Sequence, residues 1–289
     1  AIMGQTLDIA PADKKLYALR DVTATVDNMS LIASSIMSKK LASGADAIVL
    51  DVKTGSGAFM QEEEDAFALA REMVTIGNRA GRKTIAVVSD MDQPLGCAVG
   101  NALEVQEAIA TLKGEGPEDF TELCMTLGSY MLIAGGQAED EKEARKMLAA
   151  VIADGSALKK LEMFVQAQGG NPAAVLNPDL LPKASIVEEI PAPKDGFIGK
   201  IDCQEIGICS LILGGGRETK DSAIDLSVGL VLHRKTGDAV AFGESLATIY
   251  ANDRKKLDMA RERFLNAYHI TEEKVQKNAL IKGTVTEAS

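Results

Sequence analysis

The sequence predicts an α/β fold that is followed by a β-rich part, and two observations support this prediction. In the first half, short apolar runs typical of buried strands alternate with segments of helical periodicity. After about residue 186, short strand-like runs with closely spaced glycines replace this alternation. A strand, a helix and a second strand in succession favour a right-handed crossover, so we expect a mostly parallel sheet covered by helices.

The elements of the first half follow from these patterns. Residues 47–52 and 83–90 are apolar runs of the kind that is buried on both faces of a parallel sheet. Between them, residues 62–80 predict a helix that ends at Gly81. Four further helices are expected to cover the sheet, at residues 101–112, 120–134, 139–154 and 156–168.

A change of pattern marks the second half. The prolines and asparagine within residues 177–183 indicate a linker, and we place a domain boundary near residue 184. The domain from 185 to 289 is expected to be compact and β-rich. Its strands are predicted at residues 185–190, 196–201, 228–233 and 245–250, with a final helix at 254–268.

Composition and charge exclude several classes of function. The net charge of −11, from 31 basic and 42 acidic residues, opposes non-specific binding to nucleic acids and anionic membranes. No apolar run approaches the roughly 20 residues that span a bilayer, and no signal-peptide pattern opens the chain. The four cysteines lack a CxxC pairing or a partner histidine, so we expect no disulfide framework and a cytoplasmic location.

A helix near the N-terminus carries the most informative polar pair. Apolar i,i+4 pairs predict a helix here, capped by Asp27 or Ser30 and ended by Gly44. Ser35 and Lys39 lie four residues apart, so their side chains share one helix face and form a polar cluster that tolerates an anion. The alternative is that Lys39 and its neighbour only complement the negative end of the helix dipole.

Three motifs around this helix make the chain resemble a known family. They are YALRDVTATVD at residues 17–27, S-x-x-x-K at 35–39 and DVKTGSGAFM at 51–60. The sequence is similar here to the thymidine and pyrimidine-nucleoside phosphorylases, and the similarity continues through SDMDQPLG and GNALEV to the chain end. The resemblance implies reversible phosphorolysis of pyrimidine nucleosides, with a nucleoside and inorganic phosphate as substrates.

The resemblance also assigns roles to individual residues. It implies that Arg20 and Lys39 are catalytic and bind the base, that Ser35 hydrogen-bonds the base, and that Tyr17 lines the pocket. Tyr17 could equally be a packing residue. A cation and donors fixed against the base carbonyls would stabilise the negative charge that develops on the leaving pyrimidine.

The resemblance further implies a potassium ion as cofactor, with no organic cofactor. Positions matching Leu95, Ala98 and Glu107 hold a monovalent cation in bacterial relatives. A loop at 93–98 can turn carbonyl oxygens inward, and such oxygens can replace the hydration shell of potassium. From the sequence chemistry alone, Glu107 would be a solvated helix residue.

The resemblance also implies a division of the chain into three domains. Residues 1–45 would be part of a helical domain, 46–184 the central α/β domain, and 185–289 a hammerhead-like domain. Relatives carry an upstream segment and a phosphate loop, so we expect the chain to be N-terminally truncated, and neither His233 nor His269 matches the family's active-site histidine. Family members are homodimers, which predicts a homodimer here.

Two other functions compete with an enzyme that carries the base-recognition side of the reaction. One is a non-catalytic binding or assembly fragment that retains the phosphorylase fold. The other is a carrier module, since β-rich domains of this kind resemble biotinyl carriers. The sequence Arg234-Lys235-Thr236 lacks the Met-Lys-Met hairpin that presents the modified lysine, which excludes the carrier.

Overall fold

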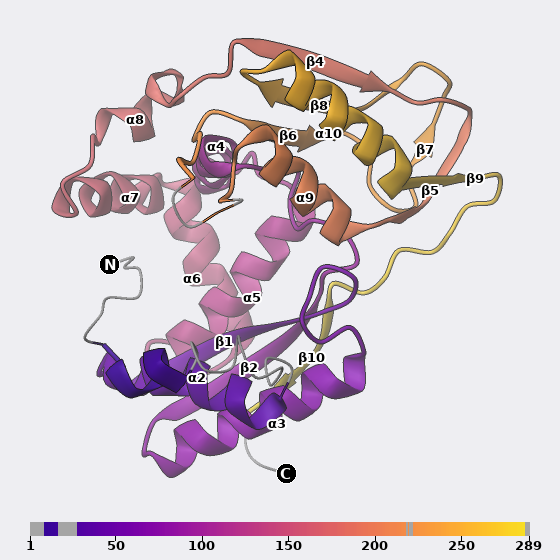
Figure 1. Ribbon diagram of the computed structural model, residues 1–289. Coiled ribbons are helices and arrows are strands. Elements are labelled where there is room, and N and C mark those ends of the chain that lie inside the picture. Colours follow the sequence, from indigo (N-terminus) through magenta and orange to yellow (C-terminus); the bar gives the residue numbers. More distant parts are fainter. Residues whose placement is uncertain (1–8, 17–27, 218, 220–221, 287–289) are drawn as a thin grey trace. The chain divides into compact units, whose positions relative to one another are not determined.

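The structure is a computed structural model that describes residues 9–16, 28–217, 219 and 222–286 (Figure 1). Its contacts divide the chain into two compact units. The first unit comprises residues 1–90, 123–149 and 280–289, and the second comprises 91–122 and 150–279. The three predicted domains are consecutive stretches of sequence, whereas each compact unit draws on separate stretches, and the predicted boundaries stay a prediction. None of the described helices is long and apolar enough to cross a membrane.

The first unit contains a three-stranded sheet of order β1-β2-β10. β1 (Ala47–Thr54) and β2 (Lys83–Asp90) are parallel, as the strand-helix-strand pattern predicts. β10 (Ile281–Val285) pairs with β2 in the antiparallel direction. The prediction of a mostly parallel sheet was therefore wrong, because a strand from the far end of the chain takes the second edge of β2.

Burial along the two parallel strands differs. After Lys83, every residue of β2 is buried, which confirms the prediction of a strand covered on both faces. β1 instead alternates between buried and less buried residues, so the prediction that it is buried on both faces was wrong. Side chains that alternate along a strand point to opposite faces, so β1 offers one apolar face and one face that carries Asp51 and Lys53.

Helices lie on both faces of this sheet (Figure 1). α3 (Glu63–Arg79) contacts all three strands, and α2 (Met29–Ala42) packs against α3. On the other face, α5 (Glu118–Ala134) reaches β10 through Tyr130, whose hydroxyl lies 3.2 Å from the Thr284 hydroxyl. The buried core of this unit combines α2, α3 and the strands, including Ala33, Met37, Ile48, Leu50, Val52, Leu69, Met73, Val74 and Val88.

The predicted helical cover is only partly correct. α5 covers the sheet from residue 123 onward, and α6 (Glu141–Ala153) belongs to the same unit up to residue 149. α4 (Asn101–Leu112) contacts β3, β6 and α7 (Ser156–Ala167), which lie in the second unit. Helical periodicity predicts that a face is buried but does not specify which partner buries it.

The second unit contains two antiparallel sheets. The larger has the order β3-β6-β8-β4, formed by β3 (Ala98–Val99), β6 (Gly229–Leu232), β8 (Ser245–Ala251) and β4 (Ile186–Pro191). The smaller has the order β7-β5-β9, formed by β7 (Ala239–Val240), β5 (Gly196–Ile201) and β9 (Tyr268–Thr271). The four strands predicted for this half lie within one residue of their predicted bounds, which confirms its β-rich character.

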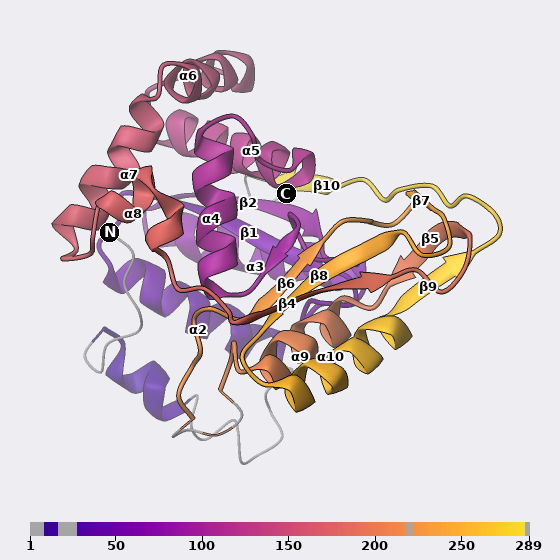
Figure 2. The ribbon, with the colours of Figure 1, turned by 90° about the horizontal axis from the view of Figure 1, so that it is seen from above.

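Two helices pack side by side against these strands (Figure 2). α10 (Arg254–Ala267) was predicted, whereas α9 (Cys203–Leu213) was not. Local signals for α9 are present, because the Asp202 carboxylate accepts from the Glu205 N–H and Gly214 ends the helix with φ +106°. The remaining short helices of this unit are α8 (Ala173–Leu176) and the 3₁₀ turn Pro178–Leu180.

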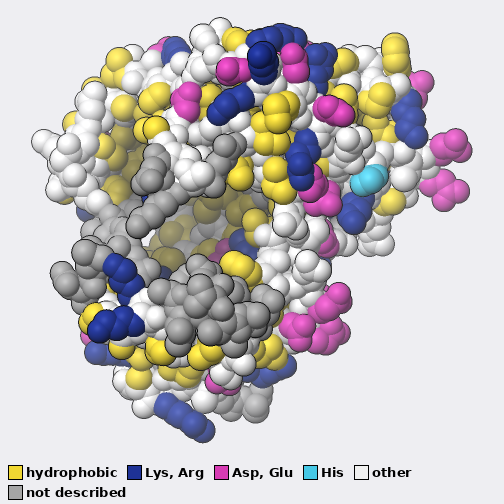
Figure 3. All heavy atoms as spheres, viewed as in Figure 1, with side chains coloured by type: hydrophobic (Ala, Val, Ile, Leu, Met, Phe, Trp, Pro, Cys, Tyr) yellow, Lys and Arg dark blue, Asp and Glu magenta, His cyan; other side chains and the backbone are white. Residues whose placement is uncertain are grey.

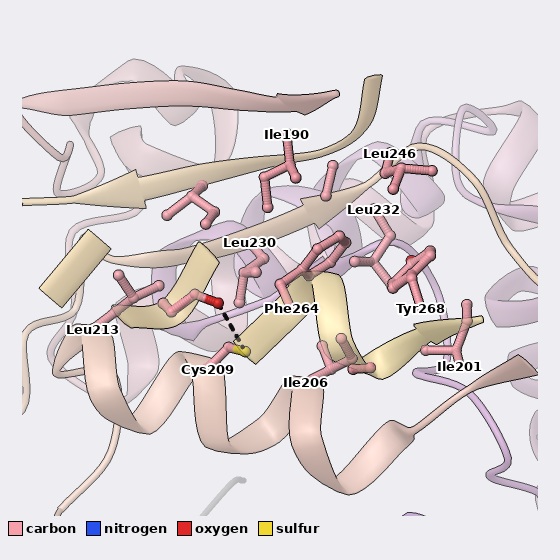
Figure 4. Packing of buried hydrophobic residues seen from close by; sticks show 14 of the residues in the cluster. Ile190, Ile201, Ile206, Cys209, Leu213, Leu230, Leu232, Leu246, Phe264 and Tyr268 are labelled. Carbon is pink, nitrogen blue, oxygen red and sulfur yellow. Dashed lines mark hydrogen bonds between the residues drawn. The ribbon is translucent and has the colours of Figure 1, made fainter. Parts of the chain in front are cut away.

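The core of the second unit lies between the two helices and the strands (Figure 4). Phe264 is fully buried and stacks on Tyr268 with ring centroids 4.4 Å apart. The Cys209 thiol lies 3.4 Å from the Ala260 carbonyl oxygen, which joins α9 to α10. Burial raises the pKa of Cys209 to about 12, so this thiol stays protonated and serves packing.

The surface carries both signs of charge. On the face shown in Figure 3, lysine and arginine side chains lie among aspartates and glutamates. An intermingled surface with a net charge of −11 gives no support to a nucleic-acid interface.

Phe264→Ala should lower the free energy of unfolding of the second unit by about 3–5 kcal/mol, since it removes a fully buried ring from a packed core. Phe242→Ala is the matched control, because this ring is 73% exposed and its loss should cost less than about 0.5 kcal/mol. Denaturant unfolding of both variants measures the difference. Equal losses would contradict the assignment of the core.

Candidate functional site

The first polar cluster lies on α2 in the first unit. Asn28 caps this helix by accepting from the Leu31 N–H at 3.1 Å, in place of the predicted Ser30, while the predicted Asp27 lies outside the described residues. Gly44 follows the C-terminus with φ +76°, as predicted. The Lys39 ammonium donates to the Ser35 hydroxyl at 2.8 Å, which confirms that the two side chains share one face.

Asp13 completes this cluster and was not predicted. It lies in the helical segment 11–16, and its carboxylate accepts from the Lys39 ammonium at 2.7 Å. Ser35 is buried, and the Asp13 side chain is 10% exposed against 29% for Lys39. No local spacing connects residues 13 and 39, so sequence periodicity contained no signal for this pair.

Within the described part of the chain, the Lys39 ammonium has two acceptors and can bind one more. Lysine has three N–H donors, and Ser35 and Asp13 take two of them. The third can point at an oxygen of a bound molecule, such as a carbonyl that gains negative charge. Lys40, one residue later, is exposed and takes no part in the cluster. Tyr17 and Arg20, predicted to act with Lys39, lie outside the described residues.

A second polar network lies on the sheet face that carries Asp51. The Lys53 ammonium pairs with the Asp51 carboxylate at 2.7 Å and donates to the Ser89 hydroxyl at 3.0 Å, and Ser89 donates to Asp51 at 2.5 Å. At the end of β2, Lys282 pairs with Asp90 at 3.0 Å. No role was predicted for these residues, although Asp51 and Lys53 occur at the i,i+2 spacing that places two side chains on one strand face.

In the second unit, the predicted cation ligands lie in and beside the loop that follows β2. Leu95 and Ala98 are in residues 93–98, and Glu107 is on α4. Glu107 on α4 accepts from the N–H groups of Cys97 and Ala98, at 2.8 and 3.0 Å, through the same carboxylate oxygen. Its other oxygen lies against Gly96, where a Cβ atom would come within 2.1 Å of it. Glu107 is therefore a half-buried residue with fixed partners, which differs from a solvated helix carboxylate.

Electrostatics at this loop depend on Lys235 and Asp119. Burial raises the pKa of Glu107, and the two backbone donors counter part of that rise. Burial also raises the pKa of Cys97, although the nearby Lys235 opposes this change. Lys235 forms an ion pair with Asp119 and donates to the carbonyl oxygens of Pro94 and Gly96, each at 2.7 Å.

This arrangement offers oxygen atoms to a monovalent cation. Backbone carbonyls of Leu95 and Ala98, with the Glu107 carboxylate, are the hard oxygen donors that potassium prefers. A side chain at position 96 would overlap the Glu107 carboxylate, so the glycine lets the loop pack directly against it. The chemistry of these donors fits a monovalent cation, and the cation site stays a prediction that rests on the family resemblance. Neither Lys235 nor Asp119 was predicted to take part in it.

Lys235 was noted in the sequence only for lacking the flanking residues of a carrier lysine. Its side chain is 14% exposed, and its ammonium is occupied by two carbonyls and one carboxylate. A lysine held in this way is not presented for covalent modification, which agrees with excluding the carrier function.

Comparison with known proteins supports the resemblance seen in the motifs. Residues 1–158 match a family model described as "Glycosyl transferase family, a/b domain". Residues 197–271 match the "Pyrimidine nucleoside phosphorylase C-terminal domain". The two matches cover stretches in both halves of the sequence.

Curated relatives agree with the family models. The chain is 56% identical over 281 residues to a pyrimidine-nucleoside phosphorylase from Geobacillus stearothermophilus, covering 97% of this chain and 65% of the relative. It is 54% identical over 287 residues to that of Staphylococcus epidermidis and 53% identical over 287 residues to that of Bacillus subtilis, covering 99% of this chain and 66% of each relative. The chain thus spans just under two thirds of these relatives, and it belongs to the pyrimidine-nucleoside phosphorylase family within the glycosyl transferases.

Proposed function

We propose that this chain supplies the base-recognition side of an enzyme that catalyses reversible phosphorolysis of pyrimidine nucleosides. In this reaction, a phosphate oxygen forms a bond to the anomeric carbon of the sugar while the bond from that carbon to the base nitrogen breaks. The bonding electron pair leaves with the base, and the sugar becomes a (deoxy)ribose 1-phosphate. Negative charge therefore develops on the pyrimidine and spreads to its carbonyl oxygens.

The observation that carries this proposal is the position of the Lys39 ammonium. Ser35 and Asp13 hold it at 2.8 and 2.7 Å and, among the described residues, leave one donor for a base carbonyl. A cation fixed before the reaction interacts more strongly with the developing pyrimidinate than with the neutral base, which lowers the barrier. Ser35 would orient the base, and Arg20 would supply a second cation with a planar fork of donors.

Asp13 acts in this proposal as a positioning residue. A half-buried ammonium without a counter-charge would be costly, and the carboxylate offsets that cost while holding Nζ in place. Because Ser35 and Asp13 already hold two donors of the Lys39 ammonium, substrate binding requires little rearrangement of this side chain.

We extend the proposal to potassium as the bound cation and to a homodimer as the assembly. The carbonyls of Leu95 and Ala98 with the Glu107 carboxylate would hold the ion, which when bound supplies a fixed positive charge beside this loop. The homodimer rests on family resemblance. Sedimentation of the chain at micromolar concentration as a species of twice its monomer mass would support the dimer, and a monomer would count against it.

Phosphate-dependent release of uracil from uridine, and of thymine from thymidine, tests the function. The assay compares the chain with a chimera that adds the unmatched third of the Geobacillus stearothermophilus relative, both in potassium buffer. We expect the chimera to release both bases only when phosphate is present. An inert, folded chimera that still binds uracil would favour the alternative, a binding or assembly protein that retains the fold.

In the active chimera, Lys39→Met should lower kcat/KM by about 10²–10³-fold, which is the typical effect of removing one group that stabilises charge in the transition state. Ser35→Ala should cost about tenfold, since one hydrogen bond contributes about 1 kcal/mol or somewhat more. Lys40→Met is the matched control, because Lys40 is exposed on the same helix and should leave kcat/KM unchanged. Equal effects at positions 39 and 40 would reject a specific role for Lys39.

A further inference from the structure

The turn between β6 and β7 is anchored by hydrogen bonds within the second unit. The Lys235 N–H donates to the Asp238 carboxylate at 2.8 Å, and the Asp238 N–H donates to the Lys235 carbonyl oxygen at 3.0 Å. The Tyr268 hydroxyl donates to the Arg234 carbonyl oxygen at 3.0 Å. The backbone that carries Lys235 is therefore fixed before its side chain makes any contact.

The side chain of Lys235 contacts the loop of residues 93–98 and Asp119 on α5. Its ammonium donates to the carbonyl oxygens of Pro94 and Gly96, each at 2.7 Å, and pairs with the Asp119 carboxylate. These three acceptors match the three donors of an ammonium group. From the next residue of the turn, the Thr236 N–H donates to the Gln93 side chain at 3.0 Å, so the turn holds the loop at two points.

These contacts determine the orientation of successive peptide groups in the loop. Each peptide is planar and trans, so its C=O and N–H point in opposite directions. The Gly96 N–H points at Asp119, 3.3 Å away, and the Leu95 carbonyl of the same peptide must therefore point away from Asp119. The peptides on either side are held by Lys235 through the Pro94 and Gly96 carbonyls, so the central peptide cannot flip alone.

The next two peptides are held from the other side. The Cys97 and Ala98 N–H groups both donate to Glu107, and the Cys97 carbonyl accepts from the Leu232 N–H at 2.8 Å. Among the described residues, none donates a hydrogen bond to the Leu95 carbonyl oxygen. The peptides on either side of the Leu95–Gly96 peptide are thus fixed, and the Leu95 carbonyl oxygen can accept another partner.

We propose that Lys235 is a positioning residue that pre-organises the Leu95 carbonyl, and through the loop the Ala98 carbonyl, as ligands for a monovalent cation. The inference rests on the part of the proposed function that places potassium at Leu95, Ala98 and Glu107. Lys235 does not repel that cation strongly, because Asp119 neutralises its charge. The Glu107 carboxylate then remains as the counter-charge for the bound ion.

Potassium-dependent thermal unfolding of the chain tests this inference without measuring activity. Potassium chloride is titrated against choline chloride at constant ionic strength, and the rise of the unfolding midpoint gives an apparent potassium affinity. We expect Lys235→Met to weaken this affinity at least tenfold. Lys277→Met is the matched control, since Lys277 forms an exposed ion pair with Asp238 in the same turn and should leave potassium affinity unchanged.

The outcomes separate this inference from the proposed function. If Lys235→Met binds potassium within twofold of the control, the positioning role is overturned while the cation site stands. If the unaltered chain shows no potassium-specific rise, both the cation site and this inference fail. An inert chimera with potassium binding that depends on Lys235 would overturn the catalytic proposal alone.

A conservative variant covers the case in which Lys235→Met does not fold. Lys235→Arg keeps the charge and the pair with Asp119, but its planar fork cannot place donors on three converging acceptors as an ammonium does. We expect it to weaken the apparent potassium affinity at least threefold while the chain remains folded by circular dichroism. Unchanged affinity in this variant would also overturn the inference.

Discussion

The ammonium of Lys39 lies between the Ser35 hydroxyl and the Asp13 carboxylate, and the account of base recognition depends on this contact. A lysine on a surface helix normally samples many rotamers, and holding it in one costs side-chain entropy. Here a half-buried counter-charge offsets that cost, so the cation is in place before substrate arrives. The packing of α2 on α3, with Ala33 and Met37 fully buried, fixes the helix that carries the pair.

A lysine ammonium held by fixed acceptors also occurs in the second unit, where we propose a different role for it. Lys235 has its donors satisfied by two carbonyls and one carboxylate, and its role is to fix backbone rather than to meet substrate. Both lysines are less than one third exposed, and each is paired with an aspartate. A carboxylate partner keeps the local charge balanced, which allows an ammonium to act as a directional donor away from bulk water.

The sequence predicted contacts between residues that are close in the chain and missed contacts between residues that are far apart in it. The four-residue spacing of Ser35 and Lys39 predicted their contact, and Gly44 marked the end of their helix, because helix geometry alone determines both. Asp13 and Lys39, or Lys235 and Pro94, are brought together only by tertiary packing, and no periodicity connects them. The third strand of the first sheet, β10, was missed for the same reason, since it follows β2 by about 190 residues in the chain.

Resemblance to a family assigned roles to residues whose roles physical reasoning alone would have left undecided. Spacing could not separate Lys39 from a lysine that complements the helix dipole, nor Glu107 from a solvated carboxylate. The structure disfavours a lysine that only complements the helix dipole, because Lys39 has two fixed partners. It also disfavours a solvated carboxylate at position 107, because Glu107 accepts from two backbone N–H groups. Their roles with substrate and cation remain the proposals stated above.

The central claim is that Lys39 stabilises negative charge on the departing pyrimidine, and the dependence of rate on the acidity of the base measures this most directly. The measurement follows log(kcat/KM) for a series of 5-substituted uridines against the pKa of the released uracil, in the active form and in its Lys39→Met variant. Loss of the cation leaves the leaving group to stabilise its own charge, so the account predicts a steeper negative slope in the variant. Equal slopes, with Lys39→Met lowering all rates by one common factor, would contradict it.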